Sequence, residues 1–208
     1  MKVSTYALKI PQEVKMKGVV AESIKDRIWT YEGYLRGEIP PEVSEVVEGK
    51  EVRKMPTGGL HGWLEGMLYW MLSRALRQNF YVLVGEVALL LSRSPLTLLG
   101  ADIVVISRER LKTLPEGAVE IPPDLIVEIV SPSERVPYVL KKMEDYRRWG
   151  VKRQVWVFPA DEEVVVITSE GLESHPADEE VALIGNVKFK LSELLKEVKD
   201  EAGGSRKA

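Results

Sequence analysis

The sequence predicts an α/β fold in which a mixed central sheet is covered by helices on both faces. Apolar residues from Leu60 to about Arg77 recur at the spacing of one helix face, and they do so again over residues 134–149. The other apolar segments are short runs rich in β-branched and aliphatic residues, at 80–91, 101–106, 124–130, 153–158 and 163–168. Strands that are apolar on both sides must be covered on both sides. The element order αβββαβ therefore predicts a helix layer on each face of the sheet.

Weaker signals accompany the long helices and the strands. Gly150 stands where the second long helix is expected to end, because glycine readily adopts the left-handed conformation of a helix C-terminus. Four smaller elements are also expected: a short helix over 28–37, a hairpin of short strands over 45–55, a short strand at 187–189 and a terminal helix from Ser192.

Length and composition predict a single domain. The 208 residues are 45% hydrophobic and 29% charged, which is enough to bury one sizeable core. We expect an N-terminal arm at 1–28, the folded domain at 29–200 and a disordered tail at 201–208. No apolar run approaches the ~20 residues of a membrane span, and none resembles a signal peptide. The sequence therefore predicts a cytoplasmic protein with no membrane partner.

Composition also excludes several kinds of chemistry. The chain has no cysteine, which rules out disulfides, thiolate zinc sites and cysteine nucleophiles. Phosphate-loop, dinucleotide-binding and serine-hydrolase motifs are absent from the sequence. The two histidines, His61 and His175, are far apart in the chain, so a multi-histidine metal site has little support. Carboxylates and lysines remain as the candidate functional groups.

Two carboxylates interrupt strands that are otherwise expected to be buried. Asp102 precedes the apolar run 103–106, and Glu128 stands between two aliphatic residues. An ionised carboxylate in apolar surroundings is costly unless a cation or hydrogen-bond donors lie beside it. The pair therefore predicts a site for a hard metal ion such as Mg²⁺. Asp124 lies four residues before Glu128 on the same face of a strand, and the pattern supports a direct role and a strand-start cap equally.

Helix geometry separates Lys142 from its neighbour Lys141. At about 100° per residue, Lys142 shares its side of the helix with largely apolar residues, namely Tyr138, Val139, Tyr146 and Trp149. Lys142 is therefore expected to face inward. It is either held beside carboxylates or extends to the surface, and the helix pattern alone favours the second. Taken singly, Glu45 is expected to be a solvated strand residue and His61 an exposed residue near a helix start.

Several motifs occur together in an order that resembles a known family. The segment from Pro123 to Phe158 carries a Pro-Asp-hydrophobic-Val-Glu strand, then Ser-Pro-Ser, then a lysine-containing helix that ends in Gly-Val. Upstream stand GADIVVIS, with its aspartate, and EVVEGKEV followed by His61 and Gly62. Over residues 30 to 195 the chain resembles the Uma-type putative restriction endonuclease family, a branch of the PD-(D/E)XK nuclease superfamily.

The resemblance implies a restriction-endonuclease-like αβββαβ core and a metal-dependent endonuclease that acts on DNA. It implies that Asp102 and Glu128 bind Mg²⁺ or Mn²⁺, that Lys142 is the catalytic lysine and that Glu45 is an additional acidic member of the site. Asp124 and His61 are candidates of lower rank. Basic residues around the lysine-bearing helix are expected either to contact the phosphate backbone or to form an ordinary solvated face: Arg135, Lys141, Arg147, Arg148, Lys152 and Arg153.

Two alternatives stay open at the level of the sequence. The chain could keep the nuclease fold as a non-catalytic interaction module, perhaps a homodimer; Tyr138, standing where relatives often carry an acidic residue, and the net charge of −3 favour this mildly. It could also be a phosphodiesterase that acts on RNA or small nucleotides.

Overall fold

The computed structural model describes residues 27–40, 43, 45–54 and 56–204. Its elements in chain order are α1 (Tyr31–Leu35), β1 (Glu45–Val47), β2 (Lys50–Val52), α2 (Gly59–Leu76), β3 (Phe80–Arg93), β4 (Leu96–Ser107), β5 (Leu125–Ile129), α3 (Val136–Trp149), β6 (Arg153–Phe158), β7 (Glu163–Thr168), β8 (Gly171–Pro176), β9 (Val181–Ile184), β10 (Val187–Phe189) and α4 (Leu191–Gly204). The predicted N-terminal arm at 1–28 lies outside the described residues except for its last two.

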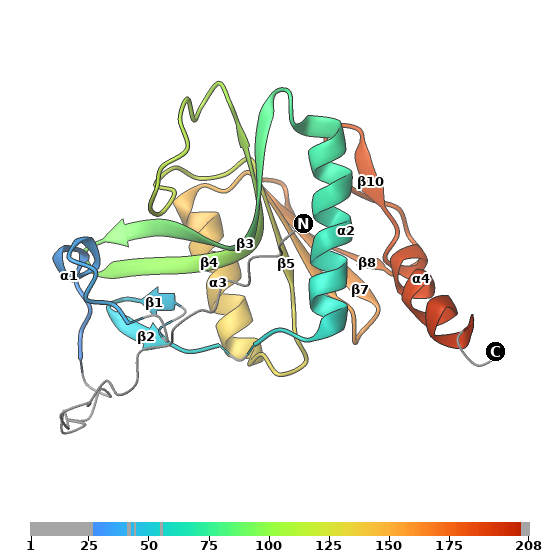
Figure 1. Ribbon diagram of the computed structural model, residues 1–208, viewed down its shortest axis with the longest axis horizontal. Coiled ribbons are helices and arrows are strands. Elements are labelled where there is room, and N and C mark those ends of the chain that lie inside the picture. Colours follow the sequence, from blue (N-terminus) through green and yellow to red (C-terminus); the bar gives the residue numbers. More distant parts are fainter. Residues whose placement is uncertain (1–26, 41–42, 44, 55, 205–208) are drawn as a thin grey trace, which may run out of the picture.

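An eight-stranded mixed sheet forms the centre of the fold (Figure 1). Its strands lie in the order β2-β1-β4-β5-β6-β7-β8, and β3 pairs with β4. The neighbours β5 and β6 run parallel and are connected through α3, whereas the other paired strands of this sheet run antiparallel. The strands β9 and β10 form a separate two-stranded sheet. The run α2, β3, β4, β5, α3, β6 confirms the predicted order αβββαβ and the mixed sheet.

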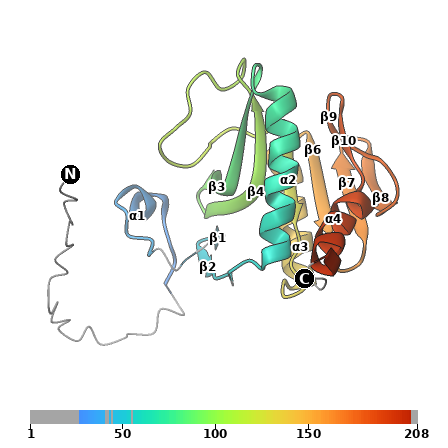
Figure 2. The same cartoon turned by 45° about the vertical axis from the view of Figure 1, so that its right-hand side comes forward.

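The helices α2 and α3 cover opposite faces of the large sheet (Figure 2). On one face, Leu64, Leu68 and Leu72 of α2 are fully buried against β4, β5 and β6, and α4 and the β9–β10 sheet extend the same core. These leucines recur every fourth residue, so they share one side of the helix. On the other face, Val139 and Met143 of α3 pack on the sheet. Each face therefore has its own apolar core, as continuous apolar strands require.

The strand β4 changes its partner along one edge. Near its start Leu98 pairs with Val46 of β1, and farther on residues 103–105 pair with β5. Gly100 lies between these two pairings. Its backbone N–H and C=O are bonded by side chains from other elements, so the partner change leaves room for a polar site inside the sheet.

Some element boundaries differ from those that the sequence predicts. A tight turn at 94–95 returns the chain to the sheet, so β4 begins well before the predicted start at residue 101. The strands β8 and β9 were not predicted, because β8 is an exposed edge strand without apolar alternation and β9 spans four residues. The helix α4 continues to Gly204 and so includes the start of the predicted disordered tail at 201–208. None of the helices that the structure describes is long and apolar enough to cross a bilayer.

Candidate active site

Four elements bring one lysine and three carboxylates together beside the partner change in β4. The Nζ atom of Lys142 on α3 lies 2.9 Å from Oε1 of Glu128 on β5 and 3.1 Å from Oε1 of Glu45 on β1. Asp102 on β4 directly precedes Ile103 and Glu128 directly follows Val127, which form the last pair of the antiparallel β4–β5 ladder, so the two carboxylates are neighbours across the strands. All four side chains are buried. The structure thus brings together the four residues that the sequence and the family resemblance single out, and their roles stay predictions.

The backbone of Gly100 connects these side chains. Its N–H donates to Oε1 of Glu45 at 2.9 Å, and its carbonyl oxygen accepts from Nζ of Lys142 at 2.6 Å. A side chain at this position would collide with the carboxylate of Glu86, which packs directly against Gly100. Glycine therefore lets the Glu86 carboxylate pack against this strand, and a larger residue would require that flexible side chain to move aside.

Asp102 is held from two sides. Its Oδ2 atom accepts a hydrogen bond of 2.7 Å from the backbone N–H of Ile129. Its Oδ1 atom lies 3.3 Å from Nε2 of His61, which stands in the first turn of α2. Within the described residues, Nδ1 of His61 is buried and has no hydrogen-bond partner. The expectation of an exposed His61 is therefore wrong, because the packing of α2 on the sheet turns this side chain toward Asp102.

The two adjacent lysines of helix α3 lie on different sides of the helix, as the helix period predicts. Lys142 is 2% exposed, and the ring of Tyr146 one turn later lies beneath its ammonium group. The side chain of Lys141 is 42% exposed and forms surface ion pairs with Asp145 and Glu48. The surface-seeking alternative for Lys142 is excluded by this burial.

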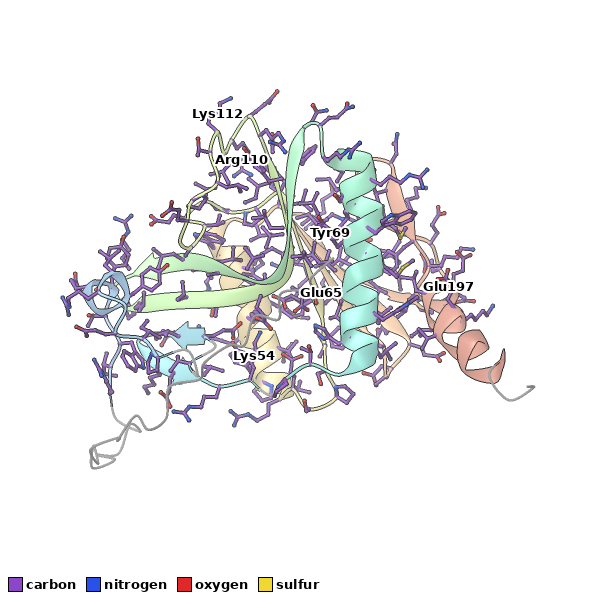
Figure 3. All side chains as sticks on the ribbon, viewed as in Figure 1. Lys54, Glu65, Tyr69, Arg110, Lys112 and Glu197 are labelled. Atoms are coloured by element: carbon purple, nitrogen blue, oxygen red, sulfur yellow. The ribbon has the colours of Figure 1, made fainter. Side chains whose placement is uncertain are left out.

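Two residues of the cluster were not assigned to it from the sequence. Tyr146 was expected to pack beside Lys142, but its hydroxyl also donates to Oε1 of Glu128 at 2.7 Å. Lys54 follows β2, and its Nζ atom lies 3.0 Å from Oε1 of Glu45 and 3.2 Å from Oε2 of Glu86. In Figure 3 Lys54 is labelled in front of α3, and in the chain it belongs to the segment between β2 and α2. No periodic signal marks Lys54, because it stands in an irregular segment between a strand and a helix.

Burial and neighbouring charges set the protonation of the cluster. Burial raises the pKa of Glu128 to about 7, although Lys142 opposes this effect. Burial also acts to raise the pKa values of Glu45 and Asp102, but opposing contacts together hold both below their usual values: Lys142, Lys54 and the N–H of Gly100 for Glu45, and His61, the N–H of Ile129 and Lys142 for Asp102. Burial alone would lower the pKa of Lys142, but the carboxylates around it hold that pKa well above its usual value. Lys142 is therefore charged.

A pocket of about 140 Å³ opens beside the cluster. Asp102, Glu128 and His61 form part of its wall, together with the segment that follows β2 and the loop from β5 into α3. These two segments contribute polar and charged side chains, namely Arg53, Lys54, Thr57, Ser131, Ser133, Glu134 and Arg135. Lys142 is not among the lining residues. The two predicted metal ligands thus line the pocket, whereas the predicted catalytic lysine does not.

The donors at this pocket fit a hard divalent cation. Among the described residues no group of three or more His, Cys, Asp or Glu side chains is arranged to hold a metal ion. Mg²⁺ typically takes one or two carboxylates and completes its shell with water and phosphate, so the predicted pair Asp102 and Glu128 has the type and number of ligands that this ion needs. When ionised, the four carboxylates of Glu45, Glu86, Asp102 and Glu128 outnumber the cations paired with them, which are Lys54, Lys142 and, when protonated, His61. A divalent cation would balance the remaining negative charge.

Asp124 lies apart from the cluster. Its carboxylate pairs with Lys152 at 2.6 Å and with Arg110 at 3.0 Å, and it accepts a hydrogen bond from the N–H of Ser107. These contacts tie the start of β5 to the end of β4, as the strand-start alternative predicts. We therefore give Asp124 no part in the proposed chemistry.

The basic residues around α3 are mostly paired within the protein. Arg147 and Arg148 share the carboxylate of Glu144, and Lys141 and Lys152 pair with aspartates. Of the six basic residues predicted around this helix, Arg135 alone lines the pocket. The solvated-face alternative thus describes most of this surface, whereas Arg135 lies at the pocket together with Arg53 and Lys54.

Comparisons with known proteins agree with this geometry. The profile of the Uma2 family, described as "Putative restriction endonuclease", matches residues 31–196. The crystal structure of a putative nuclease belonging to DUF820 from Anabaena variabilis ATCC 29413 superposes with a TM-score of 0.66 at 19% identity. This match covers 80% of the present chain and 97% of the other. At that identity the likeness shows the fold. No curated protein sequence matches the chain.

Proposed function

This chain belongs to the Uma2 family of putative restriction endonucleases, and from that membership and the geometry of its pocket we propose that it is a metal-dependent endonuclease that hydrolyses phosphodiester bonds in DNA. The observation that supports this most directly is the buried cluster in which Lys142 holds Glu45 and Glu128 beside Asp102, at the wall of an open pocket. Buried charges are costly, and clusters of this kind concentrate at functional sites.

In this proposal Asp102 and Glu128 hold a Mg²⁺ or Mn²⁺ ion, which when bound supplies polarisation of the phosphate and a lower pKa for a coordinated water. Neighbouring groups of the chain orient both carboxylates. His61 and a backbone N–H orient Asp102. Lys142 and the hydroxyl of Tyr146 both contact the same oxygen of Glu128. Such outer contacts fix the direction of a metal-binding carboxylate and tune its affinity.

Lys142 is the lysine that the family resemblance assigns to catalysis. We propose that it acts from inside the cluster, where its charge favours the ionised forms of Glu45 and Glu128 and fixes their positions. Without it, two carboxylates would face each other in a buried space, and Glu128 would take up a proton more readily. The pocket would then present a neutral group where a cation needs a charged one.

Cleavage assays with a matched control test the proposal. Supercoiled plasmid, single-stranded DNA and RNA are incubated with Mg²⁺ or Mn²⁺ and wild-type protein, Asp102→Asn or Asp161→Asn, the last being an exposed residue in the β6–β7 turn. We expect wild type and Asp161→Asn to nick DNA equally, and Asp102→Asn to lose at least ~100-fold, the range for removing a group that stabilises transition-state charge.

Calorimetric titration with Mn²⁺ separates the alternatives. The proposal predicts binding heat for wild type and none for Asp102→Asn. Faster cleavage of RNA than of DNA would support the RNA phosphodiesterase instead. An absence of both cleavage and metal heat in the wild-type protein would contradict the proposal and favour the non-catalytic module.

A further inference from the structure

Lys142 is enclosed by acceptors. Three oxygen atoms surround its Nζ atom: the carbonyl of Gly100 at 2.6 Å, Oε1 of Glu128 at 2.9 Å and Oε1 of Glu45 at 3.1 Å. An ammonium group carries three N–H donors, so this set matches its full capacity. The side chain is 2% exposed and does not line the pocket. To reach a substrate it would have to give up a buried acceptor, which is costly.

Lys54 has the access that Lys142 lacks. It lines the pocket together with Asp102 and Glu128, and its side chain is 18% exposed. Its Nζ atom contacts Oε1 of Glu45 at 3.0 Å, the same oxygen that Lys142 contacts. Glu45 therefore holds two ammonium groups, one behind the carboxylate pair and one at the pocket wall.

The second contact of Lys54 is easily exchanged. Its Nζ atom lies 3.2 Å from Oε2 of Glu86, whose side chain is 45% exposed. Ion pairs with such an exposed partner contribute little free energy. The oxygen of a bound phosphodiester would present the same kind of negative acceptor to Lys54. A bound phosphodiester would therefore compete with Glu86 for Lys54.

We propose that Lys54, and not Lys142, is the lysine that touches the substrate, donating to a non-bridging oxygen of the phosphodiester in the pocket. Lys142 is then a positioning residue for Glu45 and Glu128. This inference rests on the proposed nuclease function and assigns the contact within the same site. It also gives Glu86 a defined effect: its carboxylate weakens substrate binding by holding Lys54 and repelling phosphate.

DNA binding measured apart from cleavage tests the assignment. A short fluorescein-labelled DNA duplex is titrated with protein in Ca²⁺, its integrity is checked on a gel, and anisotropy is followed over a range of salt. Lys54→Met is compared with Lys54→Arg, Glu86→Gln and Lys50→Met, a control at an exposed lysine of β2 outside the pocket. Thermal melts establish that each variant is folded.

The expected pattern has opposite signs for the two partners. Lys54→Met binds about tenfold more weakly, as loss of one charge-assisted hydrogen bond predicts. Its salt dependence, the slope of log K against log salt, falls by about 0.9, which corresponds to one phosphate contact fewer. Lys54→Arg keeps most of the affinity, Lys50→Met matches wild type, and Glu86→Gln binds several-fold more tightly. Lys142→Met lowers kcat while its salt slope stays that of wild type.

Two outcomes would overturn the assignment, and they are distinguishable. In the first, wild type cleaves DNA, but either Lys54→Met binds and cleaves as Lys50→Met does, or the slope of log K against log salt falls in Lys142→Met. The nuclease function then stands and the assignment of Lys54 is wrong. If wild type neither binds nor cleaves DNA, the proposed function and this inference fall together.

Discussion

Replacing Lys142 by methionine keeps an unbranched, apolar stem and removes the charge at the centre of the cluster. In the variant, Glu45 would still contact Lys54 and the N–H of Gly100. Of the described contacts of Glu128 Oε1, only the hydrogen bond from the hydroxyl of Tyr146 would remain. Removing one partner of a buried ion pair costs about 3–5 kcal/mol of stability. We therefore expect Lys142→Met to lower the free energy of unfolding by about this amount at pH 8.

The free energy of unfolding that Lys142→Met loses should be smaller at lower pH. Glu128 already has a pKa of about 7 in the intact protein, and without Lys142 it is raised further, so at pH 5 this carboxyl is neutral and needs no cation. Urea unfolding followed by tryptophan fluorescence at pH 8 and pH 5 measures both values. The control is Lys141→Met, one residue earlier, whose exposed ion pairs are worth about 1 kcal/mol at most.

Comparing Lys142→Met with Lys141→Met isolates the effect of the buried charge on the free energy of unfolding. Both variants change one lysine of α3 to the same residue, so helix propensity and net charge change equally. Equal losses of unfolding free energy for Lys142→Met and Lys141→Met at pH 8, or a larger loss for Lys142→Met at pH 5 than at pH 8, would refute the role assigned to the buried ammonium group.

Two further predictions concern Glu128 and its donors. In metal-free protein the pKa of Glu128 is raised from its ordinary value of 4.5 to about 7 in the folded state, so the free energy of unfolding should fall by about 3 kcal/mol as pH rises through this window. Glu128→Gln should remove this pH dependence of the free energy of unfolding, measured by urea unfolding at several pH values, and an identical pH dependence in both proteins would contradict the prediction. His61 contributes equally to the pH dependence of both proteins. Tyr146→Phe should cost about 1–3 kcal/mol at pH 8, because a buried carboxylate loses a donor. Tyr138→Phe, whose hydroxyl has no partner within the described residues, should cost much less, and equal costs would count against the Tyr146 contact.

Part of the candidate site follows from local patterns in the chain. The period of α3 distinguishes the inward Lys142 from the outward Lys141, because side-chain direction on a helix depends on spacing alone. Asp102 and Glu128 are recognisable because each lies in a run of aliphatic residues, where a carboxylate would otherwise carry a large desolvation cost. The order of strands and helices likewise follows from apolar periodicity, apart from the polar edge strand β8 and the four-residue strand β9.

The contacts between these residues follow from the tertiary structure. Glu45 lies on β1, where a solvated side chain was expected, and Lys54 lies in the irregular segment after β2. His61 lies in the first turn of α2, whose buried face is formed by leucines. They join the site because β4 exchanges β1 for β5 as its partner around Gly100, which opens the sheet edge to side chains. The sequence by itself determined the elements and the candidate charges, since both depend on neighbours along the chain. Which charges meet was decided by strand register and helix docking, because those depend on residues that are far apart in the sequence.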